Sequence, residues 1–220
     1  MNLRQLIDTA RLRAGDDASG YLWSDDEWTE FANDAENQAC RRARLIVDST
    51  TTEITEIALS VGTATYDLDQ RVIFIRRAKL DGRSTPLRPA SFKDLDECRP
   101  DWQDETGEPE NYVVDMDTDK FRPYPTPSAT GTVNLTVVRT PLELMSGDDD
   151  EPEIKPRYHL SLVDWMLYRA YSKKDSERFD AKKAKDHFDD FEREFGKPST
   201  AVEELWINQQ HGLTPDEGVY

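Results

Sequence analysis

Apolar residues at the start of the chain repeat every three or four positions, which is the spacing of one helical face. They are Leu3, Leu6, Ile7, Ala10 and Ala14. This pattern predicts a helix over residues 2–14. A loop rich in Asp follows between Gly15 and Gly20.

A second helix is predicted to begin at Ser24. Ser24 and Glu27 match a capping box, and acidic residues in the first turn complement the helix dipole. We expect this helix to end near Val47. Its apolar stripe consists of Trp28, Phe31, Ala32, Ala35, Ala39 and Ile46.

From Thr50 to Pro141 the pattern changes to short runs of β-branched and aromatic residues between turn signals. Ser91 is predicted to open a short helix within this region, and a hairpin turn is expected around Asp117 and Thr118. The short connections favour largely antiparallel pairing. Strands are predicted near residues 53–59, 64–68, 71–81, 110–116, 120–125 and 132–140.

An acidic stretch over residues 146–156 is predicted to be a linker without regular structure, after which the helical period returns. Two stripes predict a helical hairpin that ends at Gly196 and Pro198. The first stripe is Leu160, Val163, Leu167, Ala170 and Tyr171. The second is Ala181, Ala184, Phe188, Phe191 and Phe195.

These elements predict an α+β protein. Two helices leave an apolar stripe uncovered, so the N-terminal pair is expected to pack against the C-terminal hairpin. The result is a discontinuous helical bundle with an inserted antiparallel β domain and an extended C-terminal tail. The expected parts are residues 1–48 (bundle), 49–152 (β domain), 153–197 (bundle) and 198–220 (tail).

The tail carries large apolar residues beyond the last predicted helix, namely Trp206, Ile207, Leu213 and Tyr220. Such groups favour a docking site over free solvent. Two interpretations stay open: a segment that folds back on its own domain, or an arm that docks on another subunit or partner.

Charge narrows the possible functions. The 220 residues include 28 Lys and Arg against 45 Asp and Glu, a net charge of −17. This excess disfavours a tight grip on nucleic acid or an anionic membrane. No apolar run reaches the length of a membrane span, and the first 15 residues lack the apolar stretch of a secretory signal. Cys40 and Cys98 indicate neither a disulfide framework nor a thiolate metal site, so both are expected to be reduced.

Recognisable catalytic patterns are missing from the sequence. His159, His187 and His211 lack metal-ligand spacing, and we interpret His187 as a solvated residue. Asp115, Asp117 and Asp119 alternate as in a calcium loop. Lys120 and Thr126 stand where that loop needs Gly and Glu, so a polar hairpin turn is expected instead. We therefore predict no catalytic residue, cofactor or metal, with a carboxylate-dependent hydrolase as the enzymatic alternative.

Two charged clusters allow more than one interpretation. Arg41, Arg42 and Arg44 either compensate the helix dipole and pair with neighbouring helices, or contact an acidic surface of another subunit. Asp148, Asp149, Asp150 and Glu151 form an exposed acidic loop or hold a divalent cation loosely. Net charge is −4 over residues 1–50, −9 over 51–150 and −4 over 151–220, which places the largest excess in the predicted β domain and the loop that closes it.

Five segments, in order, resemble the head–tail adaptor (connector) proteins of tailed bacteriophages. They are LRQLIDTARLRAGD, YLWSDDEWTEFANDAENQACRRARLIVD, GEPENYV, FRPYPTP, and the stretch from PEIKPRYHLSLVDW to DDFEREFG. The resemblance implies a virion structural protein of the neck, assembled in the host cytoplasm. Other neck or tail components, namely head-completion and tail-terminator proteins, are the alternative.

The resemblance also implies the partners. Such adaptors form a ring, typically of twelve copies, on the portal protein, and they extend the DNA channel toward the downstream tail or nozzle protein. By this resemblance Trp206, Ile207, Leu213 and Tyr220 are candidates for portal docking. Acids that face the channel, Asp148 to Glu151 among them, would let DNA pass without specific binding.

Overall fold

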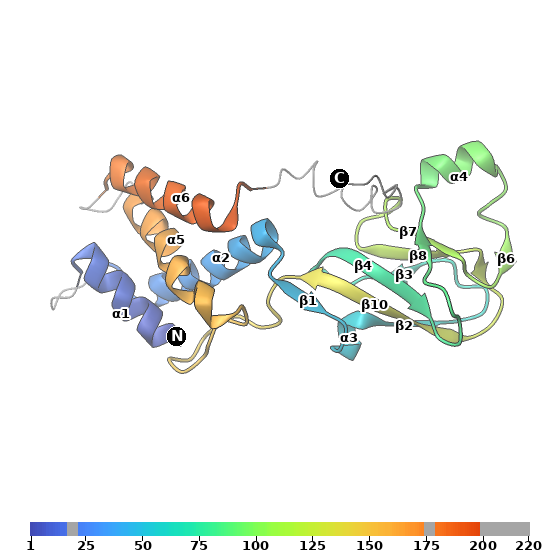
Figure 1. Cartoon of the computed structure of the whole chain (residues 1–220), viewed down its shortest axis with the longest axis horizontal. Helices are drawn as coiled ribbons and strands as arrows, with labels where there is room; N and C mark the ends of the chain where they lie inside the picture. The colour runs from blue at the N-terminus through green and yellow to red at the C-terminus, as the bar shows by residue number, and fades with distance from the viewer. Residues whose placement is uncertain (17–21, 174–178, 199–220) are drawn as a thin grey trace, which may run out of the picture. The chain divides into compact units, whose positions relative to one another are not determined.

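The computed structural model describes residues 1–16, 22–173 and 179–198. The chain is mixed α+β and separates into two compact units. Residues 1–46 and 140–198 form a helical unit, and residues 47–139 form a unit built mainly from strands (Figure 1). Among the described residues no helix combines the length and apolar character that crossing a membrane requires.

Four long helices make up the helical unit, and α5 packs against the other three. Local capping explains where they start and stop. Asn2 and Gln5 form a capping box at the start of the first helix, and the predicted box of Ser24 and Glu27 opens the second. The helices are α1 (Leu3–Ala14), α2 (Asp25–Ala43), α5 (His159–Ser172) and α6 (Ala181–Phe195), with a short 3₁₀ turn, η1 (Pro156–Tyr158), before α5.

The second helix ends earlier than expected. Arg44 adopts a left-handed backbone with φ of 53°, which stops α2 at Ala43. The chain then enters strand β1 (Ile46–Asp48), which lies beside β10 (Gly131–Arg139). The prediction that this helix continues to Val47 was wrong. Residues 46–48 form a strand instead, because they pair with β10, which is distant in sequence.

The core of the helical unit is aromatic and aliphatic. Fully buried side chains include Trp23, Trp28, Met166 and Phe191. Two residues assigned to apolar stripes lie outside this core: Leu160 is 49% exposed, and Ala181 is exposed. Both stand in the first turn of their helices, where fewer neighbours cover them.

A buried arginine fixes the corner between α1 and α2. Arg11 donates to the carboxylates of Asp16 at 2.8 Å and Asp25 at 2.6 Å, and to the carbonyl of Trp23 at 2.9 Å. The Arg11 bond holds the pKa of Asp25 below its usual range. This network joins the two helices across the short loop between them.

The second unit contains short strands and two short helices. Its further elements are α3 (Thr52–Thr55), β2 (Glu56–Leu59), β3 (Tyr66–Asp67), β4 (Val72–Leu80), β5 (Arg88–Pro89), α4 (Phe92–Cys98), β6 (Thr106–Gly107), β7 (Asn111–Val113), β8 (Lys120–Tyr124) and β9 (Thr126–Pro127). Ser91 caps α4, as predicted. Residues 52–55, in contrast, form a helical turn at the place where the first strand was expected to begin.

Strand β10 is the centre of the larger sheet. It pairs antiparallel with β2 and β4 and also neighbours β1. Its side chains Val133, Leu135, Val137 and Val138 are all buried. Strands β3, β8, β7 and β5 follow in that order in the second sheet.

The pairing is largely antiparallel, as predicted, but two short pairs run parallel. Strand β5 pairs with β7, and β6 pairs with β9. Parallel pairing requires a long crossover between the two strands. The segment that carries α4 supplies it in the first case, and the β7–β8 hairpin supplies it in the second.

The acidic segment after β10 is ordered by the helical unit. The N–H groups of Leu3 and Arg4 donate to the carbonyls of Asp150 and Asp148 at 2.7 and 3.1 Å. Met145 and Ile154 are buried in the helical core. Residues 140–152 therefore belong to the helical unit, whereas the sequence interpretation grouped them with the β domain.

Assigning residues 140–152 to the helical unit removes their acidic residues from the charge of the β domain. Residues 47–139 hold 11 basic and 17 acidic residues, a net −6, whereas residues 1–46 and 140–198 hold 17 and 24, a net −7. The largest excess was predicted for the β domain together with the loop that closes it, and part of that excess comes from residues 140–150 of the helical unit. Residues 47–139 by themselves are about as acidic as the helical unit.

Candidate functional site

Arg42 lies in an aromatic cluster formed by α2, α5 and α6. Its guanidinium carbon stands 4.9 Å from the ring centre of Trp165, 5.4 Å from Phe188 and 5.2 Å from Phe191. Burial lowers the pKa of Arg42, and Nη1 donates to the carbonyl of Gly196 at 3.4 Å. Arg42 thus stabilises the packing of its own helical unit, as the intramolecular interpretation of the arginine patch requires.

The other two arginines of the patch lie elsewhere on the helix end. Arg41 is partly exposed on the last turn of α2, and Arg44 is the exposed left-handed residue that ends it. Arg42 therefore has a different environment from Arg41 and Arg44, because it packs against aromatic rings of its own unit. A subunit contact through Arg41 and Arg44 stays a prediction.

Glu36 is a buried carboxylate in the middle of α2. It accepts hydrogen bonds from the backbone N–H groups of Glu153 at 2.6 Å and Ile154 at 3.2 Å. Burial raises its pKa to about 7, although these two bonds oppose the shift. The carbonyl of Ile154 also meets Nε2 of buried His159 at 2.8 Å. The start of the C-terminal helical segment is therefore held by polar contacts from two helices.

All four acids proposed to face a channel are exposed on the segment between β10 and η1. The carboxylate of Asp150 accepts the N–H groups of Ser146 at 2.8 Å and Gly147 at 2.7 Å, and these bonds lower its pKa. Asp150 thus shapes a turn. Asp148, Asp149 and Glu151 project from a segment whose backbone is fixed, so they form a defined acidic surface.

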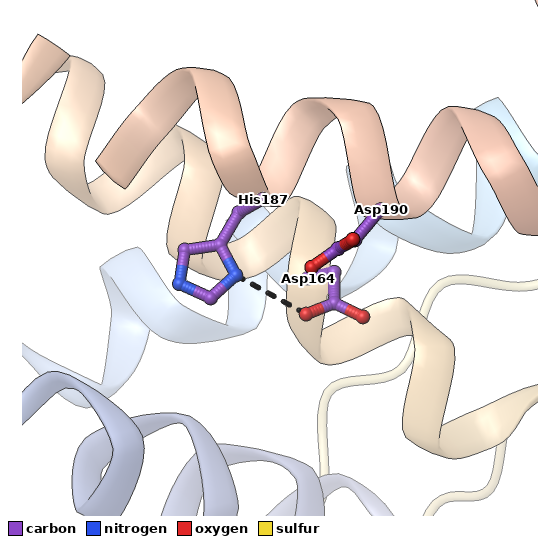
Figure 2. A group of neighbouring side chains, drawn as sticks. All are labelled: Asp164, His187 and Asp190. Carbon is purple, nitrogen blue, oxygen red and sulfur yellow. Dashed lines mark hydrogen bonds and ion pairs between the residues drawn. The ribbon is translucent and has the colours of Figure 1, made fainter. Parts of the chain in front are cut away.

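A histidine and two aspartates meet between α5 and α6. Nδ1 of His187 lies 3.2 Å from Oδ1 of Asp164, and Asp190 approaches from one turn further along α6 (Figure 2). One ligand atom from each of the three residues falls within 4.8 Å of the others. His187 is partly buried, and its ring stacks on Tyr171. The interpretation of His187 as a solvated residue was therefore wrong.

The aspartates of the β7–β8 turn have a structural role. Asp115 accepts from the hydroxyl of Ser91 at 3.0 Å and from the N–H of Phe92 at 3.2 Å, and so it holds the start of α4. Asp119 adopts a positive φ of 52° that allows the chain to reverse. This arrangement agrees with a polar hairpin turn.

Two surface hollows lie next to the groups described above, one at the β7–β8 turn and one between α5 and α6. One, of about 220 Å³, is lined by residues 114–120 together with Leu68, Val72 and Ile73. The other, of about 370 Å³, is more apolar and lies between α5 and α6; its walls include Tyr168, Phe179 and Phe188. Neither contains a nucleophile positioned beside a base.

The described residues contain no constellation typical of catalysis. Outside the described residues lie Trp206, Ile207, Leu213 and Tyr220, the candidates for portal docking. What the described chain does offer is an acidic surface at Asp148, Asp149 and Glu151, the apolar hollow between α5 and α6, and polar contacts that hold the helical hairpin.

Comparison with known proteins gives the class of protein. The family model of the SU10 adaptor protein matches residues 1–211. The chain therefore belongs to the SU10 adaptor protein family, a family of phage head–tail adaptors. No curated protein matches the chain.

Proposed function

We propose that this chain is a non-enzymatic structural protein of the phage neck. In this proposal it assembles as a ring of about twelve copies beneath the portal vertex, extends the DNA channel and presents the attachment platform for the tail. The observation that carries the proposal is the family match, which spans the helical unit, the strand unit and the tail as far as residue 211.

The charge of the chain is compatible with DNA as a passing neighbour. Phosphate backbones bind mainly to Lys and Arg, and a net acidic lining repels them. Both compact units are acidic. The exposed side chains of Asp148, Asp149 and Glu151 are the proposed lining of the channel, on a segment whose backbone is held against α1.

The proposed partners are the portal protein above, a tail or nozzle protein below, and further copies of this chain. We assign portal docking to the tail, with Trp206, Ile207, Leu213 and Tyr220 as anchors. Arg41 and Arg44 are the proposed cationic side of the contact between copies, because they stand at an exposed helix end of an acidic chain.

The test is to mix the full-length chain with purified portal rings and to examine the product by electron microscopy and native mass spectrometry. We expect a second ring on the portal with matching symmetry. Binding to tail tubes and not to portal would instead identify a tail-terminator protein. Failure to bind either would overturn the adaptor assignment.

The docking arm is tested with a chain that ends at residue 198 and with the variant W206A/L213A. Both should stay folded by circular dichroism and lose portal binding. L144A is the matched control, since Leu144 is a 70% exposed apolar residue of the helical unit. Portal binding by the shortened chain that equals the full-length value would exclude the tail as the anchor.

The channel lining is tested by the variant D148N/D149N/E151Q in assembled portal–adaptor complexes. We expect this variant to retain DNA more strongly at low salt, because repulsion of phosphate is reduced. The variant D186N/D189N/E194Q makes the same change in net charge on α6. Equal DNA retention by the two variants would show that position in the channel does not matter.

A further inference from the structure

The cluster of Asp164, His187 and Asp190 has the geometry of a shared ligand set. His187 and Asp190 are three residues apart on α6, so both side chains leave the same face of that helix. Asp164 reaches the same point from α5. Figure 2 shows the imidazole and the two carboxylates gathered in the space between the helices.

The distances suit a small divalent ion. Zn²⁺ binds imidazole nitrogen and carboxylate oxygen at about 2.0–2.2 Å, which places tetrahedral ligand atoms about 3.4 Å apart. Nδ1 of His187 and Oδ1 of Asp164 are already 3.2 Å apart. All three ligand atoms lie within 4.8 Å of one another. Asp190 is exposed, and its Oδ1 pairs with Nη1 of Arg193 at 2.8 Å, so binding the ion requires a rotamer change that exchanges this surface pair for the metal.

Neighbouring groups hold two of the three ligands in place. The ring of His187 is nearly parallel to that of Tyr171, with 6.0 Å between the ring centres. Nη1 of Arg13 lies 3.7 Å from Oδ1 of Asp164, beyond hydrogen-bond distance but close enough to orient the carboxylate. The side chains of Asp164 and His187 are 20% and 25% exposed. Such outer contacts are typical of metal sites, where they fix the orientation of the ligands.

We propose that Asp164, His187 and Asp190 bind a divalent transition-metal ion, with Zn²⁺ as the reference case, and so link α5 to α6. Three protein ligands leave one tetrahedral position for water. The imidazole selects for this class over Mg²⁺ and Ca²⁺, which prefer oxygen ligands. The ion would join the two arms of the helical hairpin, because Asp164 lies on α5 and the other two ligands lie on α6.

The experiment is isothermal titration of the full-length chain with ZnCl₂ and, separately, with MgCl₂. A C98S background removes the exposed thiol as a competing ligand. We expect one Zn²⁺ per chain and at least tenfold weaker binding of Mg²⁺. Saturating Zn²⁺ should raise the Tm of the helical unit by about 5 °C, because an ion that binds only the folded state stabilises it. Co²⁺ should give visible absorption bands from ligand coordination.

Variants locate the ion. H187Q and D190N should each weaken Zn²⁺ binding at least tenfold. Of these variants, D190N should disturb folding least, because Asp190 is exposed. D186N on the same helix makes the same charge change outside the cluster, and H211Q removes a histidine of the tail; both should bind Zn²⁺ like the parent. The proposal is overturned if Zn²⁺ does not bind, or if H187Q and D190N bind it as the parent does.

Discussion

The carboxylate of Glu36 accepts the backbone N–H of Glu153 at 2.6 Å, across 117 positions of sequence. A second bond, from Ile154, completes the contact. Glu36 is 1% exposed, so α2 holds the returning chain through a group that is costly to ionise. We therefore expect the stability of the helical unit to depend on pH.

The first prediction concerns E36Q, which keeps an acceptor oxygen but cannot ionise. Burial raises the pKa of Glu36 from 4.5 to about 7. The folded state therefore binds the proton more tightly than the unfolded state does. The parent should lose up to about 3 kcal/mol of stability between pH 4.5 and pH 8 relative to E36Q. Thermal melts across this range check it, with E30Q, on the exposed side of α2, as control. Parallel curves for parent and E36Q would contradict the prediction.

The second prediction concerns the buried pair of Asp48 and Arg139, whose Oδ2 and Nε atoms lie 2.7 Å apart. Burial raises the pKa of Asp48, but hydrogen bonds from Thr51, Thr50 and Arg139 outweigh it and hold the pKa well below its usual range. Stability from Asp48 is therefore present above about pH 4 and is lost as the pH falls further.

We expect D48A to lower the free energy of unfolding by about 3–5 kcal/mol, because the buried guanidinium of Arg139 loses the carboxylate bonded to its Nε and Thr50 and Thr51 lose their acceptor. D67A is the matched control: the Asp67 side chain is 88% exposed and pairs with Lys120, so it should cost at most about 1 kcal/mol. Urea unfolding measures both. If D48A lowered the free energy of unfolding as little as D67A does, the pair of Asp48 and Arg139 would contribute little to stability.

The third prediction concerns Phe191, which is completely buried between α2, α5 and α6. Phe191→Ala should destabilise the helical unit by about 3–5 kcal/mol, because it removes a large apolar group and leaves a cavity. Leu160→Ala is the control, since Leu160 is 49% exposed. A melt in which the two variants lose equal stability would place Phe191 outside the core.

The fourth prediction concerns the planar guanidinium of Arg42. Arg42→Lys keeps the charge but loses the flat group that covers Trp165 and Phe191. We expect a loss of about 1 kcal/mol, seen as a lower Tm. R41K, one position earlier on the same helix, should change the Tm by less than half as much. An unchanged Tm for R42K would mean that charge alone matters at this site.

Local signals in the sequence predicted much of the helical unit. The capping box of Ser24 and Glu27, the cap at Ser91 and the stop at Gly196 each depend on residues within a few positions. The long strands β4 and β10 were also predictable, because β-branched residues fill them. In contrast, β5, β6 and β9 contain two residues each, and their pairing depends on partners far along the chain.

The cluster of Asp164, His187 and Asp190 forms only through tertiary packing, so the sequence did not predict it. A search for metal ligands by spacing considers neighbours in sequence, whereas Asp164 and His187 stand 23 positions apart on two helices. Only the register of α5 against α6 brings them together. The same holds for Arg42, whose aromatic partners come from both of these helices.

The connection between the two units has a consequence for how the protein can vary. The chain passes into the strand unit through β1 and returns through β10, and these two strands are neighbours in one sheet. Because the first and last strands of this unit are neighbours, we expect that the residues between them can be shortened or exchanged without moving the ends of the helices. We therefore expect changes of length between β1 and β10 to leave the helical unit folded.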